Sequence, residues 1–456
     1  MTFAAALVVA TLASSTTPVV AHASSGVAST PKSCDAKDAE AKRAWAAESH
    51  SWLASQFHKE QRDIADSWCR MWETTNARDR SFKAENFGRT LFTGEGLHPS
   101  VASSLVPGSG FAGGATLGLE RGLVSRPLRI GLSADGLASM NGSWEGAAAV
   151  HFLGTAPRDE NDHMQGSGEF VHQHLAELSY FGPNNDSVQT NQTAFGLDKT
   201  TAAATWIVPV HGGLRLAFAV GGGWFTPREA GGATVPQVPA IFQEATTPAI
   251  ANATTYVIST AGVVWRYPFD ATSTGYRTGA SLVFRDFHEM GGQPYSFRRL
   301  DAEWTNVYTP SASIGTFTGT GYLDTSFTSG GDAVPYYLQP TAGGTDLFGR
   351  SLLRSYHDYR YRAPNLAGIV IEHERPIKYF LGSLLFADFG QVADEPSRFR
   401  LNAFHYSLGA GITLRAGNTT VLRIFYAWGG GEGTRTTVAG SSNTFGGNVG
   451  LGLTNW

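Results

Sequence analysis

The stretch Gly213–Trp224 reads GLRLAFAVGGGW, an alternation of large apolar residues with arginine, alanine and glycine. Successive side chains of a β-strand point to opposite faces, so this stretch would have one apolar face and one small, glycine-rich face. The same alternation recurs at 276–287, 296–308 and 405–415. Strands of about ten residues that are apolar outside and polar or small inside are typical of transmembrane β-barrels. A soluble β-sandwich would carry more lysine and glutamate on its outer face.

The composition of the 456-residue chain favours the same class. Charged residues make up 16 % of the chain, against roughly 25 % in ordinary soluble domains. Aromatic residues make up 12 %, and there are 54 glycines. No stretch beyond residue 25 approaches the ~20 apolar residues that a membrane helix needs. The net charge of −4 argues against nucleic acid as a partner, because no basic patch is present to neutralise phosphates.

The alternation predicts sixteen strands, an even number that suits closure of a barrel from one chain. The expected fold is all-β: a 16-stranded antiparallel transmembrane β-barrel, preceded by a short N-terminal α-helical segment. Its longest loop follows the eleventh strand. The predicted strands are 97–106, 111–121, 127–138, 142–153, 168–181, 192–209, 213–226, 253–266, 275–288, 296–309, 311–326, 367–376, 380–390, 404–415, 419–427 and 446–456.

The N-terminal part divides into two predicted segments ahead of the barrel at 97–456. Residues 1–23 resemble a secretory signal peptide with a small-x-small cleavage site, the alternative being a buried helix. Residues 24–96 form a helical segment and linker, periplasmic or lumenal. This segment holds both cysteines, Cys34 and Cys69, for which we favour an intrachain disulfide over free or intermolecular thiols. One unbroken helix would separate them by roughly 50 Å, so pairing requires a helical hairpin.

Several motifs in the last hundred or so residues occur in a fixed order. The longest loop contains LRSY at 353–356, and the next strand contains EHERP at 372–376. FADFG at 386–390 follows, and Gly409-Ala410-Gly411 and Arg423 fit the two strands after it. With these motifs the chain resembles the bacterial surface antigen superfamily of barrels, which includes outer-membrane protein assembly factors and two-partner secretion transporters. It would be a short member without POTRA domains.

The resemblance implies a contact inside the barrel. The period-two pattern places Glu372 and Glu374 on the lumenal face beside Asp388, where acidic groups repel one another unless a cation joins them. In the family, the arginine at the tip of the inward-folded loop meets the aspartate of the Phe-x-Asp-x-Gly strand. The alternative is a solvated loop arginine. The predicted loop-tip motif is Leu353, Arg354, Ser355 and Tyr356, with Ser355 where glycine is usual, and the predicted wall partners are Glu372, Glu374, Phe386, Asp388 and Gly390.

The last predicted strand is rich in glycine and ends in an aromatic residue, as barrels delivered to the outer-membrane assembly machinery typically do. Glycine weakens strand pairing. In the family that the chain resembles, the seam between the first and last strands is the proposed lateral gate. Glycine as a barrel-corner device is the alternative. The predicted seam residues are Gly446, Gly447, Gly450, Gly452 and Trp456.

Signals for enzymatic chemistry are weak. His172 and His174 share one strand face, but no acidic residue stands at metal-ligand spacing. No nucleophile elbow, phosphate loop or Cys/His cluster is present in the sequence. We therefore expect no enzyme activity, cofactor or metal.

The expected function is outer-membrane biogenesis, by insertion or translocation of polypeptide or lipid through the first–last strand seam. The alternative is a gated pore or structural barrel, plugged by its N-terminal helices and without insertase activity. Expected partners are outer-membrane lipid, unfolded outer-membrane or secreted polypeptides and a periplasmic protein. The expected location is the bacterial outer membrane or an equivalent organelle membrane.

Overall fold

The structure is a computed structural model that describes residues 96–440 except for short gaps at 103–104, 123–127, 155–163, 212, 268–274, 312, 348, 379–380, 417–418 and 431–432. These residues all belong to the second of two units into which the chain divides, 86–456. The predicted signal peptide, the helical segment with Cys34 and Cys69, and the seam residues Gly446, Gly447, Gly450, Gly452 and Trp456 lie outside the described residues.

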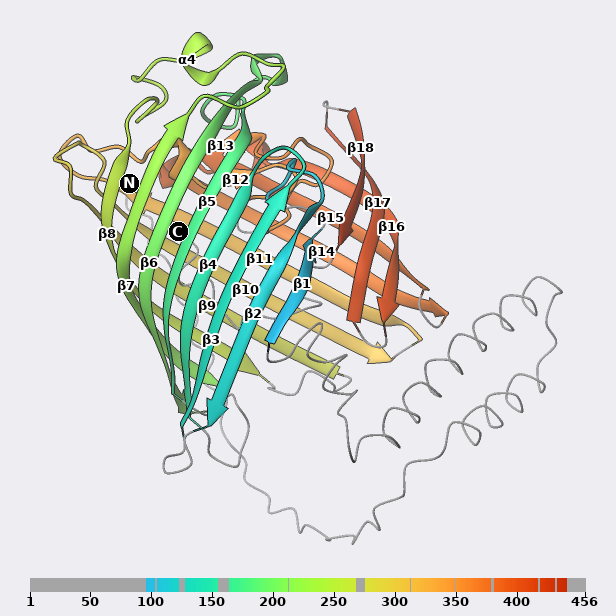
Figure 1. Cartoon of the computed structure of the whole chain (residues 1–456). Helices are drawn as coiled ribbons and strands as arrows, with labels where there is room; N and C mark the ends of the chain where they lie inside the picture. Colours follow the sequence, from blue (N-terminus) through green and yellow to red (C-terminus); the bar gives the residue numbers. More distant parts are fainter. Residues whose placement is uncertain are drawn as a thin grey trace, which may run out of the picture. The chain divides into compact units, whose positions relative to one another are not determined.

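One antiparallel sheet of sixteen strands forms the described part of this unit, and Figure 1 shows it curving around an interior. Its strands follow one another in chain order, except that β12 and β13 form a separate pair. The first eight strands are β1 (Gly96–Ala102), β2 (Ala112–Gly122), β3 (Leu128–Ser139), β4 (Trp144–Gly154), β5 (Gln165–Tyr180), β6 (Thr193–His211), β7 (Leu214–Arg228) and β8 (Thr254–Tyr267). The others are β9 (Gly275–Glu289), β10 (Phe297–Ser311), β11 (Gly315–Phe327), β12 (Thr341–Ala342), β13 (Tyr361–Arg362), β14 (Asn365–Lys378), β15 (Leu381–Ala393), β16 (His405–Ala416), β17 (Thr419–Gly429) and β18 (Gly433–Gly440).

The helical elements of the described residues are single turns in the connections between strands. They are α4 (Val238–Ile241) and the 3₁₀ helices η2 (Gln189–Asn191), η3 (Tyr336–Leu338), η4 (Pro396–Arg398) and η5 (Leu401–Ala403). Within the described residues, none of these helices has the length and apolar character needed to cross a membrane.

The two faces of the strands have the predicted character. In β7, Arg215 is 3 % exposed and faces the interior. Phe218, which points to the opposite face of the same strand, is 45 % exposed. Large apolar side chains are likewise exposed on strands around the sheet, among them Leu132, Phe170, Leu282, Phe284, Leu323, Ile371, Leu385 and Ile412. An apolar exterior over a polar interior is the arrangement that a barrel in a membrane requires.

The connections between the strands differ in length, and the longest follows the eleventh strand, as predicted. The β6–β7, β10–β11, β14–β15 and β16–β17 connections are short, whereas β7–β8 and β11–β14 are joined through residues 229–253 and 328–364. Figure 1 shows the β7–β8 connection with α4 at one end of the barrel. Long loops at one end and short turns at the other are typical of outer-membrane barrels.

Fifteen of the predicted strands coincide with observed strands to within a few residues. The exception is the last, because β18 occupies residues 433–440 and was not predicted. Its sequence, GTRTTVAG, contains threonine, arginine and glycine in place of large apolar side chains, so its alternation is hidden. The predicted strand 446–456 lies outside the described residues.

Candidate functional site: a loop tip bound to the barrel wall

The connection between β11 and β14, residues 328–364, folds into the interior of the barrel and is called the inward loop below. Its first half presents aromatic side chains, Tyr336 and Tyr337, to a cluster of apolar residues from the inner faces of β5 to β10. Its second half packs Leu352, Leu353 and Tyr356 on Leu366 and Val370 of β14 and Val392 of β15. Apolar burial on both walls therefore positions the loop tip at 353–356.

The loop tip forms the predicted contact between Arg354 and Asp388. Nη2 of Arg354 donates to Oδ1 of Asp388 at 2.6 Å, and Nε donates to Oδ2 at 2.9 Å. The backbone N–H of Arg354 also donates to Oδ2, at 3.0 Å. Asp388 is 0 % exposed and Arg354 is 4 % exposed. This is a bidentate, buried arginine–carboxylate pair, which is the strong form of a charge-assisted hydrogen bond.

Three further charged side chains extend this pair along the inner wall. Nη1 of Arg354 bonds to Oε1 of Glu372 on β14. Arg423 of β17 lies between the two glutamates, 3.6 Å from Oε2 of Glu372 and 3.4 Å from Oε2 of Glu374. Thr413 of β16 donates to Glu374 at 3.3 Å. Arg354 and Arg423 thus balance most of the negative charge of the three acidic residues, which were expected to repel one another without a cation between them.

The charge on Arg354 is favoured despite its burial. Burial alone would lower the pKa of Arg354, but its hydrogen bonds and ion pairs with Asp388 and Glu372 outweigh that effect and raise it. Its guanidinium also lies over the ring of Phe386, 3.6 Å from the ring centroid. A cation placed on an aromatic face in this way gains further attraction when it is shielded from water.

Glycines in the wall make room for the loop. A Cβ at Gly390 would lie 3.0 Å from Leu352, and one at Gly368 would lie 2.6 Å from it. A Cβ at Gly409 would overlap the ring of Phe386, the ring beneath Arg354. Gly390, the last residue of the FADFG motif, is therefore explained by close approach of the loop.

The loop tip also contacts the three strands that follow β15. The backbone N–H of Ser355 donates to Oγ of Ser407 on β16 at 2.8 Å, and the hydroxyl of Tyr356 donates to the carbonyl of Gly430, just after β17, at 3.1 Å. Arg435 of β18 donates to the carbonyl of Tyr356 at 2.7 Å and pairs with Asp358 at 2.7 Å. One short segment therefore connects the loop to β14, β15, β16, β17 and β18, and we call this set of contacts the clamp.

Ser355 stands where the resemblance predicted glycine, but the left-handed residue of the tip is Leu353, with a φ of 58°. The Ser355 hydroxyl is buried and finds no hydrogen-bond partner among the described residues. A buried hydroxyl without a partner is destabilising.

The structure adds residues to the site that the sequence prediction missed. They include Ser407, Asp358, Arg435 and Arg350, the last of which pairs with Asp324 of β11 at 2.7 Å and with Asp346 at 3.0 Å. Arg435 could have been found only by recognising the threonine-rich β18 as a strand. The partners of Arg350 come from a loop whose path periodicity does not predict.

The two histidines on β5 lie on the outer face, on the same side as the exposed Phe170, and their rings pack against Trp144. His174 bonds to Asp198, which pairs with Arg228 at 2.7 Å. In the described part of the chain, no group of three histidine, cysteine or acidic residues is arranged to hold a metal ion.

No protein-family model matches the chain, and no curated protein is similar to it in sequence. Among solved structures, it is similar to BamA from Haemophilus ducreyi lacking POTRA domains 1–3, with 13 % identity over 75 % of this chain and 68 % of that one and a TM-score of 0.51. CdiB from Escherichia coli is also similar, at 11 % identity over 75 % and 62 % of the two chains and a TM-score of 0.46. For CdiB from Acinetobacter baumannii the identity is 9 %, the coverage 76 % and 56 %, and the TM-score 0.40. The similarity to BamA shows the fold, a transmembrane β-barrel of the BamA type, and confirms the predicted fold class.

Proposed function

We propose that this chain is an outer-membrane barrel that acts in membrane biogenesis, inserting or translocating polypeptide or lipid through the seam between its first and last strands. The observation that supports the proposal is the clamp, which connects the inward loop to β14–β18 from inside the barrel. The proposal assigns no catalytic activity and no cofactor to the chain.

The clamp matters because of how a barrel is normally stabilised. In a closed barrel, each terminal strand depends on the seam for the hydrogen bonds along one of its edges. Here Arg435 anchors β18 to the inward loop through a bidentate pair with Asp358, at 3.0 and 2.7 Å. Arg435 thus holds β18 to the inward loop through a contact that does not involve the seam, which supports a seam that opens while the wall persists.

An open seam offers a strand edge to a client. A polypeptide with a strand-forming segment can pair with such an edge through backbone hydrogen bonds, as in β-augmentation. β1 has only seven residues, and in the described part of the chain it pairs with β2 alone. The expected clients are unfolded outer-membrane or secreted polypeptides, in contact with outer-membrane lipid and a periplasmic partner.

A gated or structural barrel is the second candidate function. It is favoured by the aromatic cluster around Tyr336 and Tyr337, which packs inside the barrel between the first half of the inward loop and β5–β10. An obstructed interior suits a closed pore as well as it suits a protein that works through its wall.

The experiment that separates the two follows the folding of a small unfolded barrel in liposomes that contain residues 24–456. We expect the wild type to accelerate client folding and Arg354→Ala to lose the acceleration. The matched control is Arg298→Ala, which removes an exposed ion pair between Arg298 of β10 and Asp286 of β9 on the outer face of the sheet. No acceleration above protein-free liposomes, with all variants folded, would reject the insertion function and leave the gated pore, which conductance measurements would then test.

A further inference from the structure

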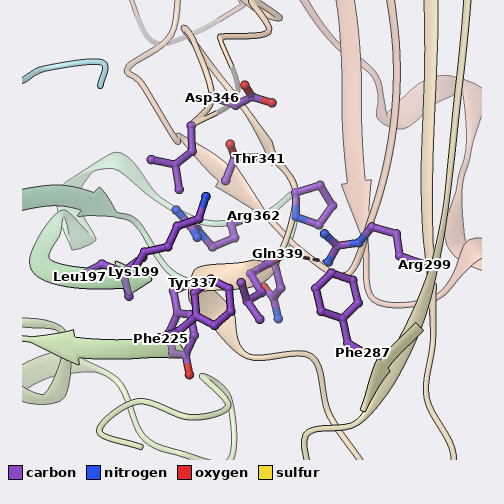
Figure 2. A pocket seen from close by; sticks show the side chains of 13 residues that line it. Leu197, Lys199, Phe225, Phe287, Arg299, Tyr337, Gln339, Thr341, Asp346 and Arg362 are labelled. Carbon is purple, nitrogen blue, oxygen red and sulfur yellow. Dashed lines mark hydrogen bonds between the residues drawn. The ribbon is translucent and has the colours of Figure 1, made fainter. Parts of the chain in front are cut away.

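A small pocket lies between the inward loop and the inner wall of the barrel, separate from the clamp. It has a volume of about 30 Å³, enough for one ion or very few water molecules. Its walls include Lys199 of β6, Arg299 of β10 and Arg362 of β13. Figure 2 shows Lys199 and Arg362 on one side of the pocket and Arg299 on the other.

Arg362 is a buried cation whose guanidinium is only partly satisfied. The residue is 1 % exposed, and its Nη1 donates to the carbonyl of Tyr336 at 2.7 Å. Its Nε and Nη2 are buried and have no hydrogen-bond partner among the described residues. Its guanidinium lies 5.9 Å from the ring centroid of Tyr180 and 5.8 Å from that of Phe195. These rings attract a cation, but they cannot accept hydrogen bonds from two N–H groups in the plane of the guanidinium.

The other two cations of the pocket interact electrostatically with acidic residues, Lys199 with Glu145 and Arg299 with Asp324, but neither acidic residue lines the pocket. Arg299 is 7 % exposed, and it donates hydrogen bonds to two neutral acceptors, Oγ of Ser326 at 3.2 Å and the carbonyl of Leu338 at 2.7 Å. Asp346 is the acidic residue among those that line the pocket, and its Oδ2 already accepts a hydrogen bond from Arg350 at 3.0 Å. Three cationic side chains thus line a small space, and Asp346, the acidic residue among its lining residues, is already bonded to Arg350.

A buried charge without a counter-charge is strongly unfavourable in a protein interior. Burial lowers the pKa of Arg362, which means that its charged form is disfavoured until an anion is added. The free N–H groups of Arg362 supply the donors that such an anion needs, and a volume of about 30 Å³ suits an ion better than a sugar or a lipid headgroup.

We propose that this pocket binds a small monovalent anion, chloride in the ordinary case, through Arg362 with Lys199 and Arg299. The bound anion joins β13 of the inward loop to β6 and β10 of the wall. It therefore holds the opposite side of the loop from the one that the clamp holds.

The test uses the full chain in detergent micelles at one ionic strength, in sodium chloride, sodium bromide or sodium gluconate. We expect the Tm to be higher in either halide than in gluconate by about 2–4 °C, because a ligand that binds only the folded state raises its stability. Arg362→Met should lose this difference, and the control Arg298→Met should keep it.

A second measurement needs no variant. Crystals of the wild type soaked in bromide should give an anomalous scattering peak next to the Arg362 guanidinium. Equal Tm values for the wild type in chloride and gluconate would overturn the proposal. So would a halide effect retained by Arg362→Met, or a pocket that contains only water in the bromide-soaked crystal.

Discussion

Arg354→Ala tests the energetics of the clamp. The substitution leaves Asp388, which is 0 % exposed, without the guanidinium that supplies two of its hydrogen bonds. Removing one partner of a buried ion pair costs about 3–5 kcal/mol, since the remaining charge stays buried and unpaired. Each 1.4 kcal/mol is a factor of about ten in an equilibrium, so the detached state of the loop should become roughly 100 to 4,000 times more populated.

Limited proteolysis measures this change, because the inward loop carries trypsin sites at Arg350, Arg360 and Arg362 that are buried or half-buried in the wild type. We expect Arg354→Ala to be cleaved between 350 and 362 at least 100-fold faster. The control Arg298→Ala removes an exposed pair worth about 1 kcal/mol or less and should leave cleavage in the loop unchanged.

A double-mutant cycle separates the pair from its surroundings. Arg354→Ala with Asp388→Ala should recover part of the lost protection, since the uncompensated carboxylate is then absent. Cleavage of Arg354→Ala at the wild-type rate would refute the reasoning. A double variant cleaved as fast as the two single effects combined would show that the two side chains do not act as a pair.

Three further predictions concern the wall, the tip and the outer face, each measured as the urea midpoint of unfolding in micelles. Gly409→Ala should destabilise the barrel by about 1–3 kcal/mol, because the added methyl overlaps the Phe386 ring, and an unchanged midpoint would contradict the proposed packing. Ser355→Ala should be neutral or stabilising by up to about 1 kcal/mol, because it removes a buried hydroxyl without a described partner, and a clear loss of stability would reveal a partner. Phe218→Arg on the lipid-facing side should cost about 2–4 kcal/mol, and a variant as stable as the wild type would place that face in water.

The sequence could predict the strands in which apolar side chains alternate with polar or small ones. Fifteen strands follow the alternation of residues such as Phe218 and Arg215, since membrane and interior impose opposite chemistry on the two faces of a strand. β18 obeys the same geometry, but its neighbouring residues Thr436 and Thr437, which point to opposite faces, are both threonine, so the contrast between the faces disappears there. A pattern of polarity cannot identify a strand whose faces are alike.

Part of the candidate site could be predicted from the sequence for a different reason. Arg354 and Asp388 could be matched because the resemblance supplied the contact and the register placed Asp388 on the inner face. Arg435, Asp358 and Ser407 were not found, because their contacts depend on the path of the inward loop. That path is fixed by packing of Leu352 and Tyr336 on strands distant in sequence, which no local pattern encodes.

Amide hydrogen exchange by mass spectrometry tests the central claim most directly, which is that the clamp holds the C-terminal strands from inside. The comparison is between the wild type, Arg435→Ala and the control Arg298→Ala, in micelles. We expect Arg435→Ala to exchange at least tenfold faster in β18 and in the loop tip at 353–358, with β3–β9 unchanged, because its bidentate pair with Asp358 anchors β18. Exchange in β18 at the wild-type rate would contradict the account.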